Sequence, residues 1–262
     1  MSAADFLSLG SGGIVGFALG LLGGGGSILA VPLLVYVVGV RSPHVAIGTS
    51  ALAVSVNAFA NLIAHSRQGN VKWPCAIVFA VSGVAGAALG ASLGKLVDGQ
   101  HLLFLFGLVM LAVALAMLNP RNAGGDPDVR LNPAIAWRLV ATGVAVGFLS
   151  GFFGIGGGFL IVPAIMLGSG MAMLNAVGSS LLSVGAFGLT TAVTYGLSGE
   201  IDWRVAVLFI LGGLLGGVGG VLAAGHLARQ RRLLAQVFAT AVIAVAGFVL
   251  WRAGSTILGY LH

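Results

Sequence analysis

The chain has 262 residues, of which 58% are hydrophobic and only 7% are charged, and its mean hydropathy is +1.10. Soluble domains carry about 25% charged residues, so this composition excludes a soluble fold and indicates an all-α integral membrane protein. The net charge of +6 is spread over short loops, which excludes a nucleic-acid-binding tract, and the single cysteine, Cys75, excludes an intrachain disulfide and a CxxC metal or redox pair.

Eight apolar segments follow in chain order, and a polar stretch at residues 119–133 divides them into two sets of four. The first set covers residues 6–40, 45–64, 74–96 and 102–118, and the second covers residues 135–168, 176–197, 205–227 and 233–258. Most of these segments have about the 20 residues that a transmembrane helix needs. The first segment of each set is longer and is broken by a glycine cluster. The N-terminus carries Asp5 and no basic region, so we do not expect a cleaved signal peptide.

The two broken segments are copies of one motif. Residues 16–32 read GFALGLLGGGGSILAVP and residues 147–163 read GFLSGFFGIGGGFLIVP, so nine of the seventeen positions are identical at an offset of 131. After a one-residue gap, GTS at 48–50 aligns with GSS at 178–180, and VKW at 71–73 with IDW at 201–203. We therefore expect one membrane domain built by duplication. Residues 1–118 form its first repeat, 119–133 a polar cytoplasmic linker and 134–262 its second repeat.

The positive charges favour one topology. If each broken segment crosses the membrane once, the basic residues split seven against five between the two sides. If each glycine cluster turns the chain back as a re-entrant hairpin, the split is eight against four. Cytoplasmic loops carry an excess of Lys and Arg, so the second arrangement is favoured. It predicts two inverted repeats in the cell (plasma) membrane, each a re-entrant segment plus three transmembrane helices, with both termini external.

The glycine clusters are the candidate anion site. A helix that restarts after each cluster, near Ser27 and near Phe159, offers unpaired N–H groups and a positive dipole end. Glycine lets a ligand approach the backbone closely, and matched breaks in two apolar halves point to a transport site. The candidate substrate-binding residues in the clusters are Gly24, Gly25, Gly26, Ser27, Gly156, Gly157 and Gly158. Other glycines are expected to allow close helix packing; these are Gly83, Gly86, Gly90, Gly212, Gly213, Gly216, Gly217 and Gly220.

Polar residues within the apolar segments extend this candidate site. Hydroxyls begin the helix after each broken segment, where they either cap that helix or donate to a ligand; they are Thr49, Ser50, Ser179 and Ser180. Asn57, Asn61 and His65 follow on one helical face, and their aligned partners are Phe187, Thr191 and Tyr195. We expect Asn57 to line the pathway and Asn61 to pack between helices. His65 is expected to be solvated at the membrane interface.

These motifs resemble the sulfite exporter TauE/SafE family of anion permeases over essentially the whole chain. The resemblance rests on GGGGSILAVP at 23–32, GIGGGFLIVP at 154–163, the GTSAL and GSSLL that follow, and the glycine-rich third helix of each half. It implies passage or export of sulfite, sulfonates, thiosulfate or a related small inorganic or organic sulfur anion. The first copy departs from the second at Gly24, aligned with Ile155, and at Ser27, aligned with Gly158.

The placement of the acidic residues bears on the mechanism. All six fall at loop or terminal positions, whereas ion-driven carriers commonly place a carboxylate within the membrane. The membrane potential supplies about 2.3 kcal/mol per charge per 100 mV, so we expect a potential-driven uniporter that exports the anion.

No catalytic group, metal or cofactor is expected; the expected partners are the substrate anion and the lipid bilayer, and a homodimer is the oligomer considered. The alternatives left open are a carrier or channel for another small solute, such as thiosulfate uptake, and a non-transport membrane subunit.

Overall fold

The computed structural model describes residues 3–117, 125, 126, 128–154, 158–227, 240 and 242–252. The first half contains α1 (Ala3–Leu22), the 3₁₀ segment η1 (Gly23–Leu29), α2 (Ala30–Pro32), the π-helical η2 (Leu33–Val38), α3 (Pro43–Arg67), α4 (Trp73–Gly94) and α5 (Gly99–Met117). The second half contains α6 (Pro133–Phe153), α7 (Gly158–Ser169), α8 (Met173–Gly196), α9 (Trp203–Leu227) and a helix at Val242–Arg252. The described residues contain no strand, only an isolated bridge between Asp126 and Met171.

Six helical stretches in the described residues are long and apolar enough to cross a membrane. They are α1 with its continuation to Val38, followed by α3, α4, α6, α8 and α9. Large apolar side chains on the outer faces of α4 and α9, such as Val81 and Leu215, are exposed, as a bilayer-facing surface requires. The prediction of an all-α membrane protein is confirmed.

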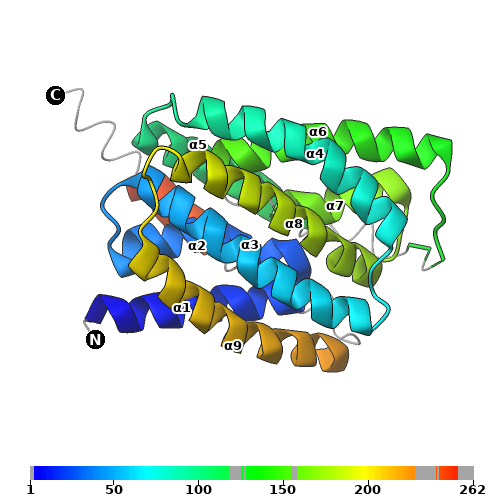
Figure 1. Ribbon diagram of the computed structural model, residues 1–262, viewed down its shortest axis with the longest axis horizontal. Helices are drawn as coiled ribbons and strands as arrows, with labels where there is room; N and C mark the ends of the chain where they lie inside the picture. The colour runs from blue at the N-terminus through cyan, green and yellow to red at the C-terminus, as the bar shows by residue number, and fades with distance from the viewer. Residues whose placement is uncertain are drawn as a thin grey trace.

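The order of contacts along the helices gives their directions. Backbone positions 12, 16 and 20 of α1 meet positions 209, 213 and 217 of α9 in turn, so these helices run parallel, and positions 143, 147 and 151 of α6 meet 79, 83 and 87 of α4 in the same way. The helices α3 and α8 run antiparallel, because the Ser55 hydroxyl donates to the Gly185 carbonyl at 2.7 Å while Gly188 lies against Ala51. Figure 1 shows α1, α3 and α9 running one way and α4, α6 and α8 the other.

We call the end of the bundle where α1, α3 and α9 begin the N-terminal end, and the end where α4, α6 and α8 begin the linker end. The antiparallel pair α3 and α8 forms the centre of the bundle. In each of them, 72% of the most apolar 18-residue window is buried inside the protein, against 28–56% in the other four spans.

Glycine stripes bring the outer helices into backbone contact. A Cβ added at Gly16 would collide with the backbone of Gly213, and one added at Gly147 would collide with the backbone of Gly83. The same holds along both interfaces, where carbonyl oxygens occupy the space of a side chain at Gly86, Gly90, Gly212, Gly216 and Gly220. The predicted close-packing role of the third-helix glycines is therefore confirmed.

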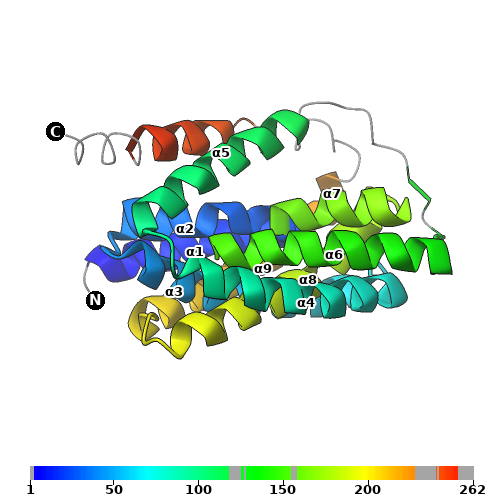
Figure 2. The ribbon, with the colours of Figure 1, turned by 90° about the horizontal axis from the view of Figure 1, so that it is seen from above.

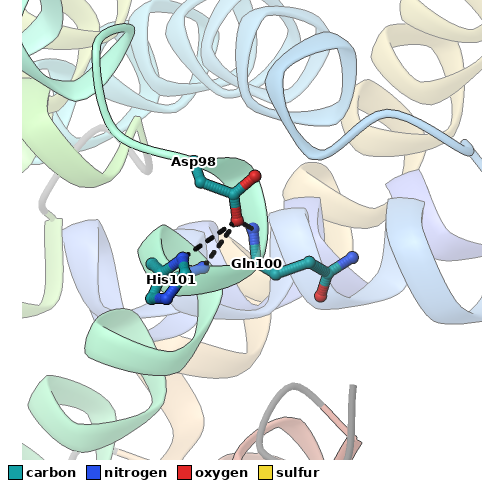
Figure 3. A network of polar contacts seen from close by, with 3 residues as sticks. All are labelled: Asp98, Gln100 and His101. Carbon is teal, nitrogen blue, oxygen red and sulfur yellow. Dashed lines mark hydrogen bonds and ion pairs between the residues drawn. The ribbon is translucent and has the colours of Figure 1, made fainter. Parts of the chain in front are cut away.

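α5 and the Val242–Arg252 helix lie together along one side of the six-span bundle (Figure 2). Their buried apolar residues, including Phe106 and Val242, pack with Ile28 and Phe153 of the broken segments. Asp98 caps the start of α5, where its carboxylate accepts from the Gln100 amide at 2.9 Å and contacts His101 Nδ1 at 3.1 Å (Figure 3). The His101 side-chain hydrogen bond, together with the amide bonds, holds the pKa of the exposed Asp98 carboxyl below its usual value.

Candidate functional site

Both glycine clusters begin with a left-handed turn at the same aligned position. Gly23 has φ +64° and Gly154 has φ +66°, a conformation that costs glycine little and other residues much. A Cβ at Gly23 would lie 2.7 Å from the Val177 carbonyl oxygen of α8, and a Cβ at Gly154 would overlap the Ile47 side chain of α3. Each turn therefore packs closely against the central helix of the other half.

After each turn the chain runs back toward the end from which it came. Gly168 at the end of α7 lies against Leu139 near the start of α6, and Val38 at the end of η2 lines a surface pocket with Ala4. In the second half, α7 begins at Gly158, as the sequence predicted for Phe159. In the first half, a 3₁₀ segment starts at Gly23 and an α-helix begins only at Ala30, three residues beyond the predicted Ser27. The four consecutive glycines disfavour an α-helical turn.

The two returning segments contact each other inside the bundle, because α7 packs against η1. Gly24, Gly25, Gly26 and Ser27 are all buried in η1, and Gly158 starts α7. Gly156 and Gly157 lie outside the described residues. The return segments of the two halves therefore contact each other, while their turns lie toward opposite ends of the bundle, Gly23 near the start of α8 and Gly154 near the start of α3.

Serine hydroxyls hold the first glycine turn in place. The Gly24 amide donates to Ser180 Oγ of α8 at 3.2 Å, and the Ser27 hydroxyl donates to the Gly24 carbonyl at 2.9 Å. The Ser180 hydroxyl donates in turn to the Val177 carbonyl at 2.8 Å, and its aligned partner Ser50 donates to the Ile47 carbonyl at 2.9 Å. The first half's turn is therefore bonded to the second half's central helix.

Thr49 and Ser179 have a different geometry. The Thr49 hydroxyl accepts from the Asp202 amide at 2.9 Å, and the Ser179 hydroxyl accepts from the Lys72 amide at 2.9 Å. Asp202 and Lys72 directly precede α9 and α4, so each hydroxyl takes up an amide at the start of the other half's third helix, where an α-helix leaves donors unpaired. This is a capping role across the two halves.

Asn57 is the most exceptional polar side chain in the interior. It is fully buried against Gly213 of α9, and neither its Oδ1 nor its Nδ2 has a hydrogen-bond partner among the described residues. A buried polar group without a hydrogen bond lowers the stability of the folded protein by about 1–3 kcal/mol. The Asn57 amide is therefore a candidate for binding a ligand or a water molecule. Asn61, one turn on, donates to the Asn57 carbonyl at 3.0 Å and packs on Gly217, which matches its predicted packing role.

The expectation of a solvated His65 is wrong. Its side chain is fully buried, and its Nε2 lies 3.0 Å from the carbonyl oxygen of Gly20 in α1. Because α1 runs parallel to α3 and ends next to it, the interior extends to the last turn of α3, which sequence position alone does not reveal.

Sequence reasoning also missed a polar cluster at the N-terminal end. Tyr195 in α8 is fully buried with its ring 6.1 Å from the His44 ring, and its backbone carbonyl accepts from the Glu200 amide at 3.1 Å. Within the described chain, the Tyr195 hydroxyl, His44 Nδ1 and Glu200 Oε2 lack hydrogen-bond partners, as do the buried hydroxyls of Ser150, Ser183 and Thr191. The one sequence feature that points to this cluster is the alignment of Tyr195 with His65, which places a polar side chain at the same position of both central helices.

A multi-span helical bundle with helices broken inside it and unpaired polar groups in its core has the architecture of a membrane transporter. The described residues contain no group of three or more potential metal ligands. The chain belongs to the sulfite exporter TauE/SafE family, whose pattern matches residues 8–249.

Curated relatives agree with this class. A probable membrane transporter protein of Xylella fastidiosa (strain 9a5c) is 52% identical over 253 residues, covering 96% of this chain and 97% of the relative. The probable membrane transporter protein YunE of Bacillus subtilis is 29% identical over 78% of this chain and 82% of the relative. The probable membrane transporter protein MJ0441 of Methanocaldococcus jannaschii is 31% identical over 68% of this chain and 67% of the relative. The family and these names describe transporters rather than enzymes, and no solved structure matches the chain.

Proposed function

We propose that this transporter exports sulfite or a related sulfur oxyanion, which binds where the return segments of the two halves meet. The observation that carries the proposal is the buried glycine turn at residues 23–26, whose Gly24 amide donates to the Ser180 hydroxyl of the other half. A bound anion would replace that hydroxyl as the acceptor. Backbone N–H groups at such a turn attract an anion without a buried cation. Proposed ligand contacts are Gly24, Gly25, Gly26, Ser27, Asn57 and Ser180 at the first turn, with Ser50, Gly156, Gly157 and Gly158 at the aligned positions of the second turn.

Asn57 supplies a neutral amide that can donate to a sulfur oxyanion, and the lack of any hydrogen-bond partner for its Nδ2 and Oδ1 among the described residues supports this role. Thr49 and Ser179 support the site without contacting the anion, because their hydroxyls accept hydrogen bonds from the backbone amides that directly precede α9 and α4. A neutral site of this kind binds a small anion while leaving it free to depart, which transport requires.

We further propose that the halves are inverted repeats. The support is that α3 and α8, aligned at an offset of 130, run antiparallel, and that the contacts between α1 and α9 recur between α6 and α4 at the same offsets. A two-fold axis in the membrane plane produces this relation. The linker end would face the cytoplasm, because the hairpin arrangement assigns eight of the twelve basic residues of the sequence to that side and only Arg41, Lys95, Arg204 and Arg252 to the other.

A liposome flux assay tests the function. Purified protein should carry sulfite across the membrane, with a current that reverses at the Nernst potential of the anion and ignores a pH gradient at fixed anion speciation. Thiosulfate and an organic sulfonate complete the panel. Failure of all three anions to cross would refute the proposed substrate class, and a reversal potential that follows the pH gradient would replace uniport by proton coupling.

A further inference from the structure

The ends of the two central helices have the same backbone geometry. The Asn70 amide donates to the His65 carbonyl and the Glu200 amide donates to the Tyr195 carbonyl, both at 3.1 Å. Between these residues lie glycines with φ +72° (Gly69) and φ +74° (Gly199). His65 and Tyr195 are therefore structural counterparts, one at the linker end and the other at the N-terminal end.

At the linker end, the His65 side chain closes a contact between α3 and α1. Because the Gly20 carbonyl can only accept, the 3.0 Å contact assigns the hydrogen to His65 Nε2. His65 Nδ1 is then an acceptor and faces Asn70 Nδ2 at 3.5 Å. Gly20 lies three residues before the Gly23 turn, so this hydrogen bond fixes the end of α1 beside the end of α3.

At the N-terminal end, the corresponding contact is not made. The counterpart of Gly20 is Gly151 in α6, at the offset of 131, and Tyr195 shares a buried apolar cluster with Phe153 of the same helix. The Tyr195 hydroxyl nevertheless has no partner among the described residues, and neither do the adjacent His44 Nδ1 and Glu200 Oε2. Unpaired polar atoms on Tyr195 and on two residues that neighbour it mark an arrangement that is incomplete in this conformation.

We propose that His65–Gly20 and Tyr195–Gly151 are alternating latches that close the linker end and the N-terminal end in turn. The inference rests on the proposed inverted repeats. When two such repeats exchange conformations, a contact made by one half in one state is made by the other half in the opposite state. In the conformation described here the His65–Gly20 latch at the linker end is formed and the Tyr195–Gly151 latch at the N-terminal end is not. A bound anion would therefore be accessible to solvent from the N-terminal end.

The test uses thiol labelling in a Cys75→Ala background. A Ser150→Cys reporter lies in the last turn of α6, toward the N-terminal end of the bundle, and a Ser183→Cys reporter lies in the half of α8 nearer the linker end. Both serines are buried without partners, so substitution breaks no described hydrogen bond. A hydrophilic maleimide then reports in detergent which end is open, without any knowledge of the substrate.

His65→Phe should slow labelling of Ser150→Cys and accelerate labelling of Ser183→Cys, each about five-fold, as expected for one lost hydrogen bond. Tyr195→Phe, which removes a single oxygen, should slow labelling of Ser183→Cys by a similar factor. Tyr36→Phe in η2 removes a hydroxyl outside both latches and should leave both rates unchanged.

Shifts in the same direction for the two variants, or Tyr195→Phe rates equal to those of Tyr36→Phe, would overturn the latch assignment. These readings are separable from the proposed substrate. Opposite shifts with no sulfite flux in the unsubstituted protein would refute sulfite transport and leave the latches intact, whereas sulfite flux without opposite shifts would do the reverse.

Discussion

The central helices α3 and α8 occupy equivalent places in the bundle but carry different polar side chains. Asn57, Asn61 and His65 on α3 correspond to Phe187, Thr191 and Tyr195 on α8, and all six are buried. The glycine interfaces around them, in contrast, repeat closely between the halves. The comparison shows that the two sets of helices share a packing framework of glycine contacts, while the buried polar side chains of their central helices differ.

The largest expected effect concerns the shared framework. Gly16→Ala and Gly147→Ala should each destabilise the protein by about 1–3 kcal/mol or more, because the added Cβ would lie 2.6 Å from the Gly213 carbonyl carbon in the first case and 2.7 Å from the Gly83 Cα in the second. Gly10→Ala, on the same helix as Gly16, meets nothing within 4 Å and is the matched control. Thermal unfolding in detergent measures all three, and a large loss in only one of the two halves would contradict the equivalence of the interfaces.

The next effect concerns the divergent interior. Asn57→Leu should leave stability unchanged or raised, because it removes an unpaired buried amide. It should reduce anion flux roughly 10- to 100-fold if the amide binds the ligand with a charge-assisted hydrogen bond. Asn61→Leu, which loses the bond to the Asn57 carbonyl, should instead lower stability and preserve flux per folded molecule. The reverse pattern would exchange the roles of the two asparagines.

A smaller effect distinguishes Thr49 and Ser179, which support the site, from the residues that contact the anion. Thr49→Val and Ser179→Ala each remove the acceptor for one amide of the other half. Each should lower the free energy of unfolding by about 1 kcal/mol with flux per folded molecule unchanged. If flux falls while stability holds, these hydroxyls contact the anion directly.

The smallest effect lies outside the bundle, at Asp98. Because the pKa of its carboxyl is lowered in the folded protein, its stabilisation is complete above the usual aspartate pKa. It is lost as the pH falls through the lowered value. Asp98→Asn keeps a good helix cap, so stability at pH 7 should change by less than about 0.5 kcal/mol. Melting curves between about pH 5 and pH 3 should show a weaker acid dependence than the unsubstituted protein.

Much of the fold could be predicted because the signals were local and repeated. The apolar segments, the break at both glycine clusters and the packing role of Gly213 or Gly83 follow from composition and from the internal alignment. The burial of His65 could not be predicted, because it depends on the parallel course of α1 beside α3. The unpaired state of Asn57 and Tyr195 is likewise a property of their three-dimensional neighbours, which no spacing rule encodes.

The cross-half role of Thr49 and Ser179 shows the same limit. The sequence predicts that both hydroxyls stand at the start of a helix, which they either cap or leave to bind a ligand. That placement is wrong, because α3 begins at Pro43 with Ser42 as its cap and α8 begins at Met173. Their partners, Asp202 and Lys72, belong to the opposite half, so sequence neighbours could not identify which helix they cap.

Gly25→Val provides the most direct test of the central claim that the glycine turn binds the transported anion. Gly25 is buried in η1 beside the amide that Ser180 holds, and a β-branched side chain there would block close approach of an anion to the backbone. Gly10→Val, where a Cβ has open space, is the control. With the amount of folded protein in the liposomes matched, the account predicts sulfite flux in Gly10→Val and none in Gly25→Val. Equal flux per folded molecule in the two variants would contradict it.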